Sequence, residues 1–162
     1  MIVPLSRGYV THVDDADWDR LRHFRWHAQV AKGRVYACRT AQTERGPRLV
    51  YMHVEILGHR GVDHINGDGL DNRRANLRPA TQSQNTQNAR KRAHHKGRPT
   101  SSRFKGVSFH RVTGKWCAYF CRRGRVVHLG LFPSERQAAL AYNAAALAEY
   151  GAFARPNVLE GM

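Results

Sequence analysis

The sequence of 162 residues predicts an α+β protein made of two small modules, and three observations lead to this fold class. Residues 104–132 form three strand-like runs separated by glycine turns, as in an antiparallel meander. An alanine-rich run typical of a helix follows them. Residues 93–101 are basic, contain Gly and Pro and have no large apolar residue, so they are expected to link a module of residues 1–92 to one of residues 102–162.

Short strands and two short helices are expected at the start of the first module. An acidic run at residues 14–17 opens one helix, and a second helix at residues 52–57 is stopped by Gly58. A turn at Ala31, Lys32 and Gly33 joins two of the strands into a hairpin. The strands are predicted at residues 8–13, 26–30, 34–39 and 49–51.

The remainder of the first module has the order strand, loop, strand, helix. A short strand is expected around residues 62–65, and the turn-forming residues 66–69 end it. Thr81 and Gln84 have the spacing of a capping box. They are expected to open a polar helix over residues 82–92.

The second module is predicted to be a three-stranded antiparallel sheet with one packed C-terminal helix. Ser134 and Gln137 form a second capping box at the start of this helix, and Gly151 is placed to end it. The strands are expected at residues 104–111, 115–122 and 125–132. The helix should cover one face, formed by Val107, Phe109, Trp116, Ala118, Phe120, Val127 and Leu129. The open face then shows Ser108, His110, Lys115, Cys117, Tyr119, Cys121, Val126 and His128, with Arg111, Arg122, Arg123 and Arg125 around it.

Charge is distributed very unevenly along the chain. Between Asn72 and Ser134 there are fifteen Lys or Arg residues and no Asp or Glu, so the whole formal charge of +15 arises in this stretch. A solvated surface normally mixes both signs. The uneven charge therefore favours a partner with a phosphodiester backbone.

Membrane insertion, export and structural zinc are not expected. No apolar run approaches the roughly 18 residues of a spanning helix, and the N-terminal residues lack the apolar core of a signal peptide. The predicted location is the cytoplasm of a bacterial host cell. Cys38, Cys117 and Cys121 contain no C-x-x-C spacing and are expected to be reduced thiols.

Asp63 and His64 are the first candidate catalytic residues. Hydrolysis of a phosphodiester needs an activated water and stabilisation of charge on the phosphate. An imidazole suits the base, and carboxylate and amide oxygens such as those of Asp63 and Asn85 suit Mg²⁺. Asp68 and Asp71 are expected to serve turn geometry, and so is Asn72, although a shifted register would make Asn72 a site residue.

The spacing of these residues resembles the HNH nuclease family with the ββα-metal fold, in its phage homing-endonuclease branch. The resemblance rests on DHINGDGLDNRRANLRPATQSQN, which contains Asp63-His64, the pair Asn76-Leu77 and Asn85. It implies that His64 is the general base, that Asn76 pins the loop, and that Asp63 and Asn85 hold Mg²⁺ or Mn²⁺. The family usually has Met-His-Arg where this chain has Met52, His53 and Val54. The resemblance therefore does not extend to a phosphate contact from an arginine at this place.

Residues 102–158 resemble the APETALA or ethylene-response-factor (ERF) type of DNA-binding domain. The resemblance lies in SRFKGV, GKW, HLGLF and AALAYNAAA. It implies that the sheet reads the major groove of DNA. The family contacts DNA through arginines and tryptophans, and most of those places hold other residues here, so its target sequence does not transfer. The candidate DNA-binding residues are Arg90, Lys91, Arg92, Lys96, Arg98, Arg103, Lys105, Ser108, His110, Arg111, Lys115, Tyr119, Arg122, Arg123, Arg125 and His128.

The function that these features predict is a metal-dependent DNA endonuclease, a homing-type nickase that acts as a monomer on double-stranded DNA. No small-molecule substrate and no membrane partner are expected. Two alternatives remain open at this point. One is a non-enzymatic DNA-binding regulator with a decayed nuclease module, and the other is an RNA-binding protein.

Overall fold

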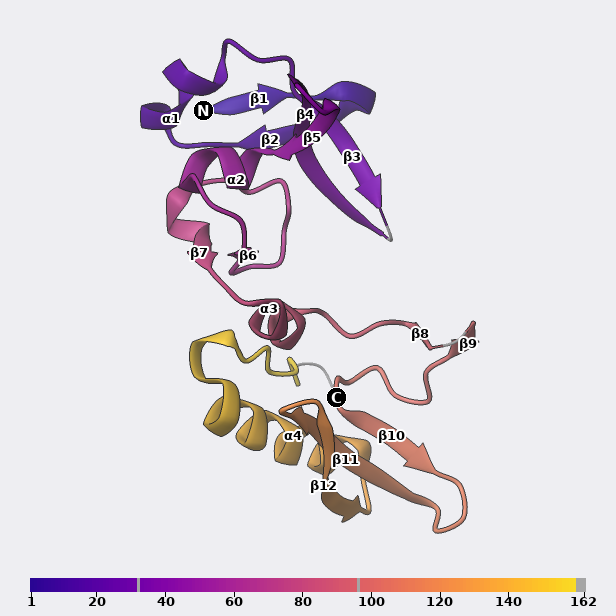
Figure 1. Cartoon of the computed structure of the whole chain (residues 1–162). Coiled ribbons are helices and arrows are strands. Elements are labelled where there is room, and N and C mark those ends of the chain that lie inside the picture. The colour runs from indigo at the N-terminus through magenta and orange to yellow at the C-terminus, as the bar shows by residue number, and fades with distance from the viewer. Residues whose placement is uncertain (32, 96, 160–162) are drawn as a thin grey trace. The chain divides into compact units, whose positions relative to one another are not determined.

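The computed structural model describes residues 1–31, 33–95 and 97–159 and divides into two compact units, Met1–Asn85 and Thr86–Met162 (Figure 1). Each unit has a hydrophobic core of its own. The division falls inside the helix α3 (Gln82–Asn88), whereas the sequence analysis assigns the whole helix, through residue 92, to the first module.

A two-stranded ribbon and a short helix begin the N-terminal unit. β1 (Ile2–Pro4) pairs antiparallel with β2 (Val10–His12), and the 3-10 turn η1 (Ser6–Gly8) joins them. α1 (Asp15–Leu21) has two acidic residues in its first turn, where the helix dipole favours negative charge. The sequence predicts β2 and α1 but not β1, because β1 ends in Pro4, a residue that argues against a strand.

A three-stranded antiparallel sheet follows, in the order β3 (His27–Ala31), β4 (Arg34–Thr43), β5 (Gly46–Tyr51). The predicted hairpin is therefore present, and the Lys32 of its turn lies outside the described residues. β4 and β5 are longer than predicted because residues 40–48 are mostly exposed and polar and lack an apolar alternation.

Two short strands and two helices complete the unit. α2 (Met52–Leu57) ends at Gly58, which has the left-handed φ of 75° expected of a helix stop. β6 (Val62–His64) pairs antiparallel with β7 (Leu77–Pro79), and the 3-10 turn η2 (Arg74–Asn76) precedes β7. α3 comes next, so the chain has the predicted order of strand, loop, strand and helix. The core of the unit includes Val3, Val13, Leu21, Trp26, Met52, Ile56, Val62 and Leu77.

The predicted capping box opens α3, but the helix is shorter than expected. The backbone N–H of Gln84 donates to Oγ1 of Thr81 at 3.2 Å, and the backbone N–H of Thr81 donates to Oε1 of Gln84 at 2.8 Å. At the other end, Nζ of Lys105 donates to the carbonyls of Gln87 and Ala89. Residues 91 and 93 would need those carbonyls in a longer helix, so α3 ends at Asn88.

The C-terminal unit contains a two-stranded ribbon and a three-stranded sheet. β8 (His94–His95) pairs with β9 (Arg98–Pro99) within the predicted linker. β10 (Val107–His110), β11 (Lys115–Arg122) and β12 (Arg125–Phe132) form the predicted antiparallel meander.

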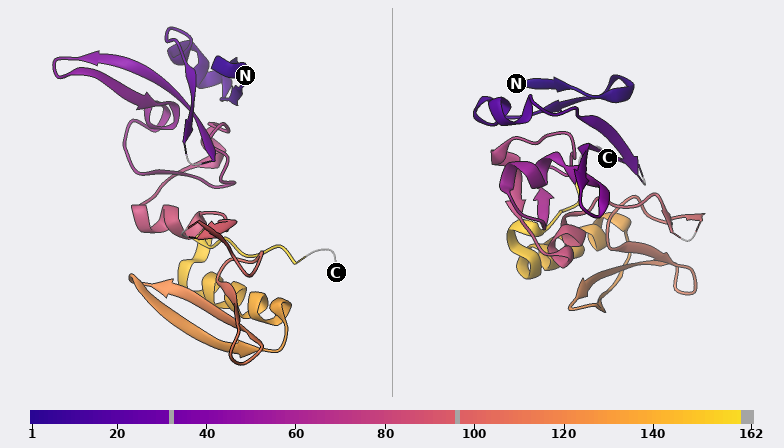
Figure 2. Two further views of the ribbon diagram at one scale, coloured as in Figure 1. Left: turned by 90° about the vertical axis from the view of Figure 1, so that its right-hand side faces the viewer. Right: turned by 45° about the horizontal axis from the view of Figure 1, so that its top comes forward.

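One long helix covers one face of the meander (Figure 2). α4 (Glu135–Tyr150) begins at Ser134, whose hydroxyl oxygen accepts the backbone N–H of Gln137 at 3.2 Å, as the predicted cap requires. It ends at Gly151, where the 3-10 turn η3 (Gly151–Phe153) begins. Small side chains on the helix permit close packing, and its buried residues are Ala138, Ala139, Tyr142 and Ala146.

The covered face of the sheet agrees with the sequence prediction except at one end. Val107, Ala118 and Phe120 are buried, and Trp116 packs beside them. Phe109 is 40% exposed, although the pattern predicts it to be covered. It stacks edge to face on Trp116 of the neighbouring strand, with ring centroids 5.1 Å apart. Over the described residues, no helix has both the length and the apolar character needed to cross a membrane.

Gly106, immediately before β10, allows the first strand to approach α4. Its φ is +70°, and a Cβ there would lie 2.0 Å from Cδ2 of Tyr142 and 2.5 Å from the carbonyl oxygen of Tyr119. Gly114 has a similar φ of +64°, but nothing lies within 4 Å of its Cβ position. A side chain at Gly114 would therefore suffer backbone strain alone, whereas one at Gly106 would suffer both backbone strain and steric overlap.

We predict that Gly106→Ala lowers the free energy of unfolding by about 3 kcal/mol, since left-handed strain adds to overpacking. Gly114→Ala should cost only about 1 kcal/mol, the strain alone. Urea denaturation followed by circular dichroism measures both. Equal losses in the two variants would contradict the role of the Tyr142 contact.

Candidate active site and nucleic-acid interface

The β6–β7 pair buries both members of the Asp-His pair. Asp63 is 4% exposed, and Arg78 lies directly opposite it in the strand register. Nη2 and Nε of Arg78 donate to Oδ2 of Asp63 at 2.7 and 2.9 Å. A buried carboxylate needs such a partner, because the burial of an unpaired charge is costly. Nothing in the sequence analysis indicates this pairing.

A chain of hydrogen bonds fixes the ring of His64. Its Nε2 lies 3.2 Å from Oδ1 of Asn72, and Nδ2 of Asn72 donates to Oγ1 of Thr11 at 2.8 Å. The Thr11 hydroxyl donates its one proton to the carbonyl of Leu70 at 2.6 Å, so toward Asn72 it can only accept. Asn72 therefore presents its oxygen to His64, and Nε2 carries the ring proton. Nδ1 is then the basic nitrogen of His64.

Aromatic rings surround His64 and keep water away from much of its surface. The ring centroids of His53 and Tyr36 lie 4.9 and 6.0 Å from that of His64, and Tyr51 stacks on His53 at 5.4 Å. Burial lowers the pKa of His64, which the hydrogen bond to Asn72 and the nearby carboxylates oppose only in part. Burial and the neighbouring His64 lower the pKa of His53 to about 3. Both rings are therefore neutral at neutral pH.

Asn76 closes the loop that connects the two strands. Its Oδ1 accepts the backbone N–H of Asn66 at 3.0 Å, and its Nδ2 donates to the carbonyl of Asp71 at 2.7 Å and to Oδ1 of Asn66 at 3.1 Å. The backbone carbonyl of Asn76 accepts the N–H of Ile65 at 2.9 Å. One side chain thus holds both ends of the loop. Arg74, two residues earlier, donates to both carboxylate oxygens of Asp17 on α1 at 2.7 and 2.8 Å, which ties the loop to the core.

The acidic residues within the loop serve its geometry, as predicted. Oδ1 of Asp68 accepts the backbone N–H of Leu70 at 3.0 Å. The carboxylate of Asp71 accepts Nε and Nη2 of Arg73, both at 2.8 Å. Asn72 differs, because its side chain reaches His64. This contact with the ring of His64 goes beyond the turn geometry that the sequence predicts for Asn72.

Asn85 lies against the same strand as the Asp-His pair. It stands on α3, and its Nδ2 donates to the carbonyl of Val62 at 3.0 Å. Because the amide nitrogen is used in this way, the amide oxygen is the atom that Asn85 can offer to a cation. The structure thus gathers Asp63, His64, Asn76 and Asn85 into one hairpin and the helix that follows it.

The donor atoms of Asp63 and Asn85 fit a hard divalent cation. Among the described residues, no group of three or more His, Cys, Asp or Glu could hold a metal ion. One carboxylate and one amide oxygen nevertheless suit Mg²⁺, which takes few protein ligands and keeps several waters. A cation at Asp63 would share its carboxylate with the guanidinium of Arg78, which already binds Oδ2.

The open face of the C-terminal sheet has the composition that the sequence predicts. Strand register places Ser108 opposite Cys117 and His110 opposite Lys115. A register shift after Ala118 brings Tyr119 opposite His128. Sγ of Cys117 lies 3.5 Å from Nδ1 of His128, so a thiol and an imidazole meet near the centre of this face.

The candidate basic residues occupy different parts of the C-terminal unit. Arg122 forms an ion pair with Glu149 at 3.2 Å, and Lys105 is directed toward the end of α3 rather than onto the open face. Arg98 lies on β9, and Lys96 lies outside the described residues. The exposed candidates are Arg90, Arg92, Arg103, Arg111, Lys115, Arg122, Arg123 and Arg125.

Comparisons with known proteins match both parts of the chain. A family model described as HNH endonuclease matches residues 60–87, the segment from before β6 into α3. An HNH endonuclease of Acanthamoeba polyphaga mimivirus is 35% identical over 157 residues, which cover 96% of this chain and 78% of the viral protein. The chain therefore belongs to the HNH endonuclease family.

Two proteins of Arabidopsis thaliana are also similar to the chain. An AP2-like ethylene-responsive transcription factor is 31% identical over 133 residues, covering 82% of this chain and 26% of the plant protein. Dehydration-responsive element-binding protein 2A is 47% identical over 66 residues, covering 38% of this chain and 19% of the plant protein. The chain thus spans only about a quarter and a fifth of these relatives. It combines an HNH module with an AP2-like module. No solved structure matches it.

We predict that Asn72→Ala lowers the free energy of unfolding by about 1–3 kcal/mol, because a fully buried amide and its partners lose their hydrogen bonds. Urea denaturation measures the loss, and Gln42→Ala, on an exposed part of β4, is the matched control. Nitrogen-15 NMR of wild-type His64 should also show the Nε2–H tautomer. A dominant Nδ1–H form would contradict the hydrogen-bond chain.

Proposed function

We propose that the protein is a metal-dependent endonuclease that hydrolyses a phosphodiester bond of double-stranded DNA. The observation that carries this proposal is the combination, on one hairpin and helix, of a neutral histidine with two hard oxygen donors. His64 and Asp63 are neighbours on β6, and Asn85 of α3 bonds to the same strand. Family membership supports the same reaction class.

His64 acts as the general base in this proposal. Its Nε2 is bonded to Asn72, so Nδ1 takes the proton of the attacking water. A base works best when its pKa lies near the working pH and it is unprotonated there, and burial favours the neutral form of His64 that can accept a proton. Thr11 and Asn72 position this base, and Asn76 positions the loop that contains Asn72.

Asp63 and Asn85 hold the divalent cation, most naturally Mg²⁺ with Mn²⁺ as a substitute. When bound there, the cation stabilises negative charge on the scissile phosphate and on the leaving 3′ oxygen. Arg78 keeps the Asp63 carboxylate in place by its two bonds to Oδ2. Its positive charge also sets a limit on how strongly Asp63 attracts a cation.

The C-terminal unit binds the DNA duplex in this proposal. Its AP2-like character and the acid-free basic stretch support this assignment. The open sheet face lies in the major groove, and the arginines around it contact phosphates. Because His110, Tyr119 and His128 replace family arginines and tryptophans, the target sequence differs from that of the plant domain.

Among the residues that the structure describes, the module contains a single candidate site of this kind, and one such site cuts one strand in each encounter. We therefore propose a homing-type nickase that works as a monomer. A second candidate function is DNA binding without cleavage. The ion pair between Asp63 and Arg78 favours it, because a carboxylate already paired with a guanidinium attracts a metal less strongly. Binding of duplex DNA without nicking in Mg²⁺ or Mn²⁺ would identify this alternative.

We predict that His64→Ala slows the nicking of supercoiled plasmid by on the order of 10²- to 10⁴-fold, because the general base is removed. Gel-shift affinity for DNA should remain unchanged. His23→Ala, which removes an exposed histidine of the same unit, is the control and should cut normally. An unaltered cleavage rate in the His64 variant would rule out the assigned base.

The metal assignment predicts that Asp63→Ala and Asn85→Ala each raise the Mg²⁺ concentration for half-maximal nicking by about tenfold or more, since each removes one of few direct ligands. Asp19→Ala removes an exposed carboxylate of α1 and should leave the titration in place. A residue whose variant retains the wild-type metal titration is not a ligand.

A further inference from the structure

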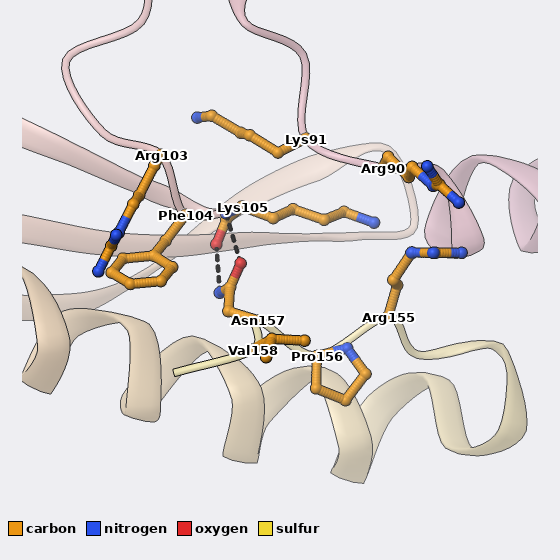
Figure 3. Close-up of a pocket in the computed structure, with 9 residues that line it drawn as sticks. All are labelled: Arg90, Lys91, Arg103, Phe104, Lys105, Arg155, Pro156, Asn157 and Val158. Carbon is orange, nitrogen blue, oxygen red and sulfur yellow. Dashed lines mark hydrogen bonds between the residues drawn. The ribbon is translucent and has the colours of Figure 1, made fainter. Parts of the chain in front are cut away.

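A pocket of about 300 Å³ lies beside α4 in the C-terminal unit (Figure 3). The chain before β10 forms one wall, and the C-terminal segment after η3 forms the other. Phe104, which lines the pocket, packs in the core beneath α4, so the pocket lies on the helix side of the sheet and not on its open face. Neither the HNH motif nor the open sheet face accounts for it.

Asparagine hydrogen bonds give this pocket a fixed wall. Asn157 accepts the backbone N–H of Lys105 at 2.7 Å and donates to its carbonyl at 3.0 Å, as the dashed lines of Figure 3 show. Asn143 of α4 in turn accepts the N–H of Asn157 at 2.6 Å and donates to its carbonyl at 2.9 Å. The C-terminal segment is thus held on both sides, and the cationic side chains beside it have a rigid support.

The side chains that line the pocket are strongly cationic. Five of the nine residues are Lys or Arg, namely Arg90, Lys91, Arg103, Lys105 and Arg155, and none is Asp or Glu. A carboxylate lies beside this cluster, because Oε1 of Glu135 accepts the backbone N–H of Arg103 at 3.3 Å. Like charges crowded in this way repel one another, and an anion in the pocket would relieve the repulsion.

Burial affects both lysines of the pocket. Burial, with the charge of Arg155, lowers the pKa of Lys105 to about 8. Burial also lowers the pKa of Lys91, although Glu135 opposes the change. Nζ of Lys105 donates to two carbonyls at the end of α3, which leaves one of its three N–H donors for a ligand.

We propose that this pocket binds a phosphate of the DNA backbone, as a contact additional to those of the open sheet face, with Arg155 as a phosphate-binding residue. Its volume is at the lower end of the roughly 300–1,000 Å³ of small-ligand sites. That volume admits a phosphate with part of its sugar, and Pro156 and Val158 provide apolar contact for the sugar. The inference rests on the proposed function, since it takes DNA as the partner.

The test measures the binding of full-length protein to a fluorescent duplex in EDTA, by anisotropy, over a range of salt concentrations. One phosphate contact contributes about −0.9 to the slope of log K against log salt. Arg155→Gln should flatten the slope by about 0.9 and weaken binding without changing sequence preference. Lys91→Gln, in the same pocket, should act in the same direction and serves if the first variant fails to fold.

Arg136→Gln is the matched control, because it removes the same charge from an exposed position of α4 that does not line the pocket. Equal flattening by Arg136→Gln and Arg155→Gln, or flattening by neither, would overturn the proposal. A second result would also overturn it. Inorganic phosphate at constant ionic strength would stabilise the wild type against heat but not Arg155→Gln, while the salt slope of DNA binding by Arg155→Gln stays the same as that of the wild type. The ligand would then be a small free anion. If the wild-type protein fails to bind DNA at all, the proposed function itself is wrong.

Discussion

Polar side chains buried in the loop between β6 and β7 determine where the candidate catalytic groups lie. This loop has little apolar side chain to bury, so hydrogen bonds and not hydrophobic packing must give it a single conformation. Asn76 makes several of them, with bonds to Asn66, to the backbone at Asp71 and across to Ile65. Because every such bond is partly shielded from water, each contributes more than it would at the surface. The cost of that arrangement is that no member of the network can be removed alone without leaving another unsatisfied.

The two units use charge in opposite ways. In the N-terminal unit, carboxylates are paired with particular arginines, as in Asp63 with Arg78 and Asp17 with Arg74. In the C-terminal unit, arginines and lysines greatly outnumber carboxylates. Paired charges specify geometry, whereas a surplus of one sign produces a long-range field. This division is consistent with one unit that arranges reacting atoms and another that attracts a polyanion.

Local patterns made much of this fold predictable, and long-range contacts made the rest unpredictable. The capping boxes at Thr81 and Ser134 depend on residues three positions apart, so the sequence alone reveals them. The Asp-His pair is likewise a local signal. The contact of Asn72 with His64 joins a loop to a strand eight residues away, and local propensity assigns Asn72 to the turn instead.

Side-chain direction was the least predictable property of the candidate binding residues. Lys105 belongs to a segment whose family resemblance places it among the DNA contacts, and its position in sequence gives no reason to expect otherwise. The carbonyls at the end of α3 need donors, and Lys105 meets that need at close range. Arg78 was missed for a related reason, since only the register of β6 with β7 brings it opposite Asp63.

The position of Thr11 means that the candidate site extends well beyond its motif. The segment of residues 60–87 that matches the family model contains His64 and Asn72, but the hydroxyl that decides which way the Asn72 amide points comes from β2. A minimal fragment restricted to the motif would retain every motif residue. It would nevertheless lose the contact of Thr11 that determines which nitrogen of His64 carries the proton. A change in this apparently peripheral strand would therefore alter the protonation of His64 while the motif itself stays constant.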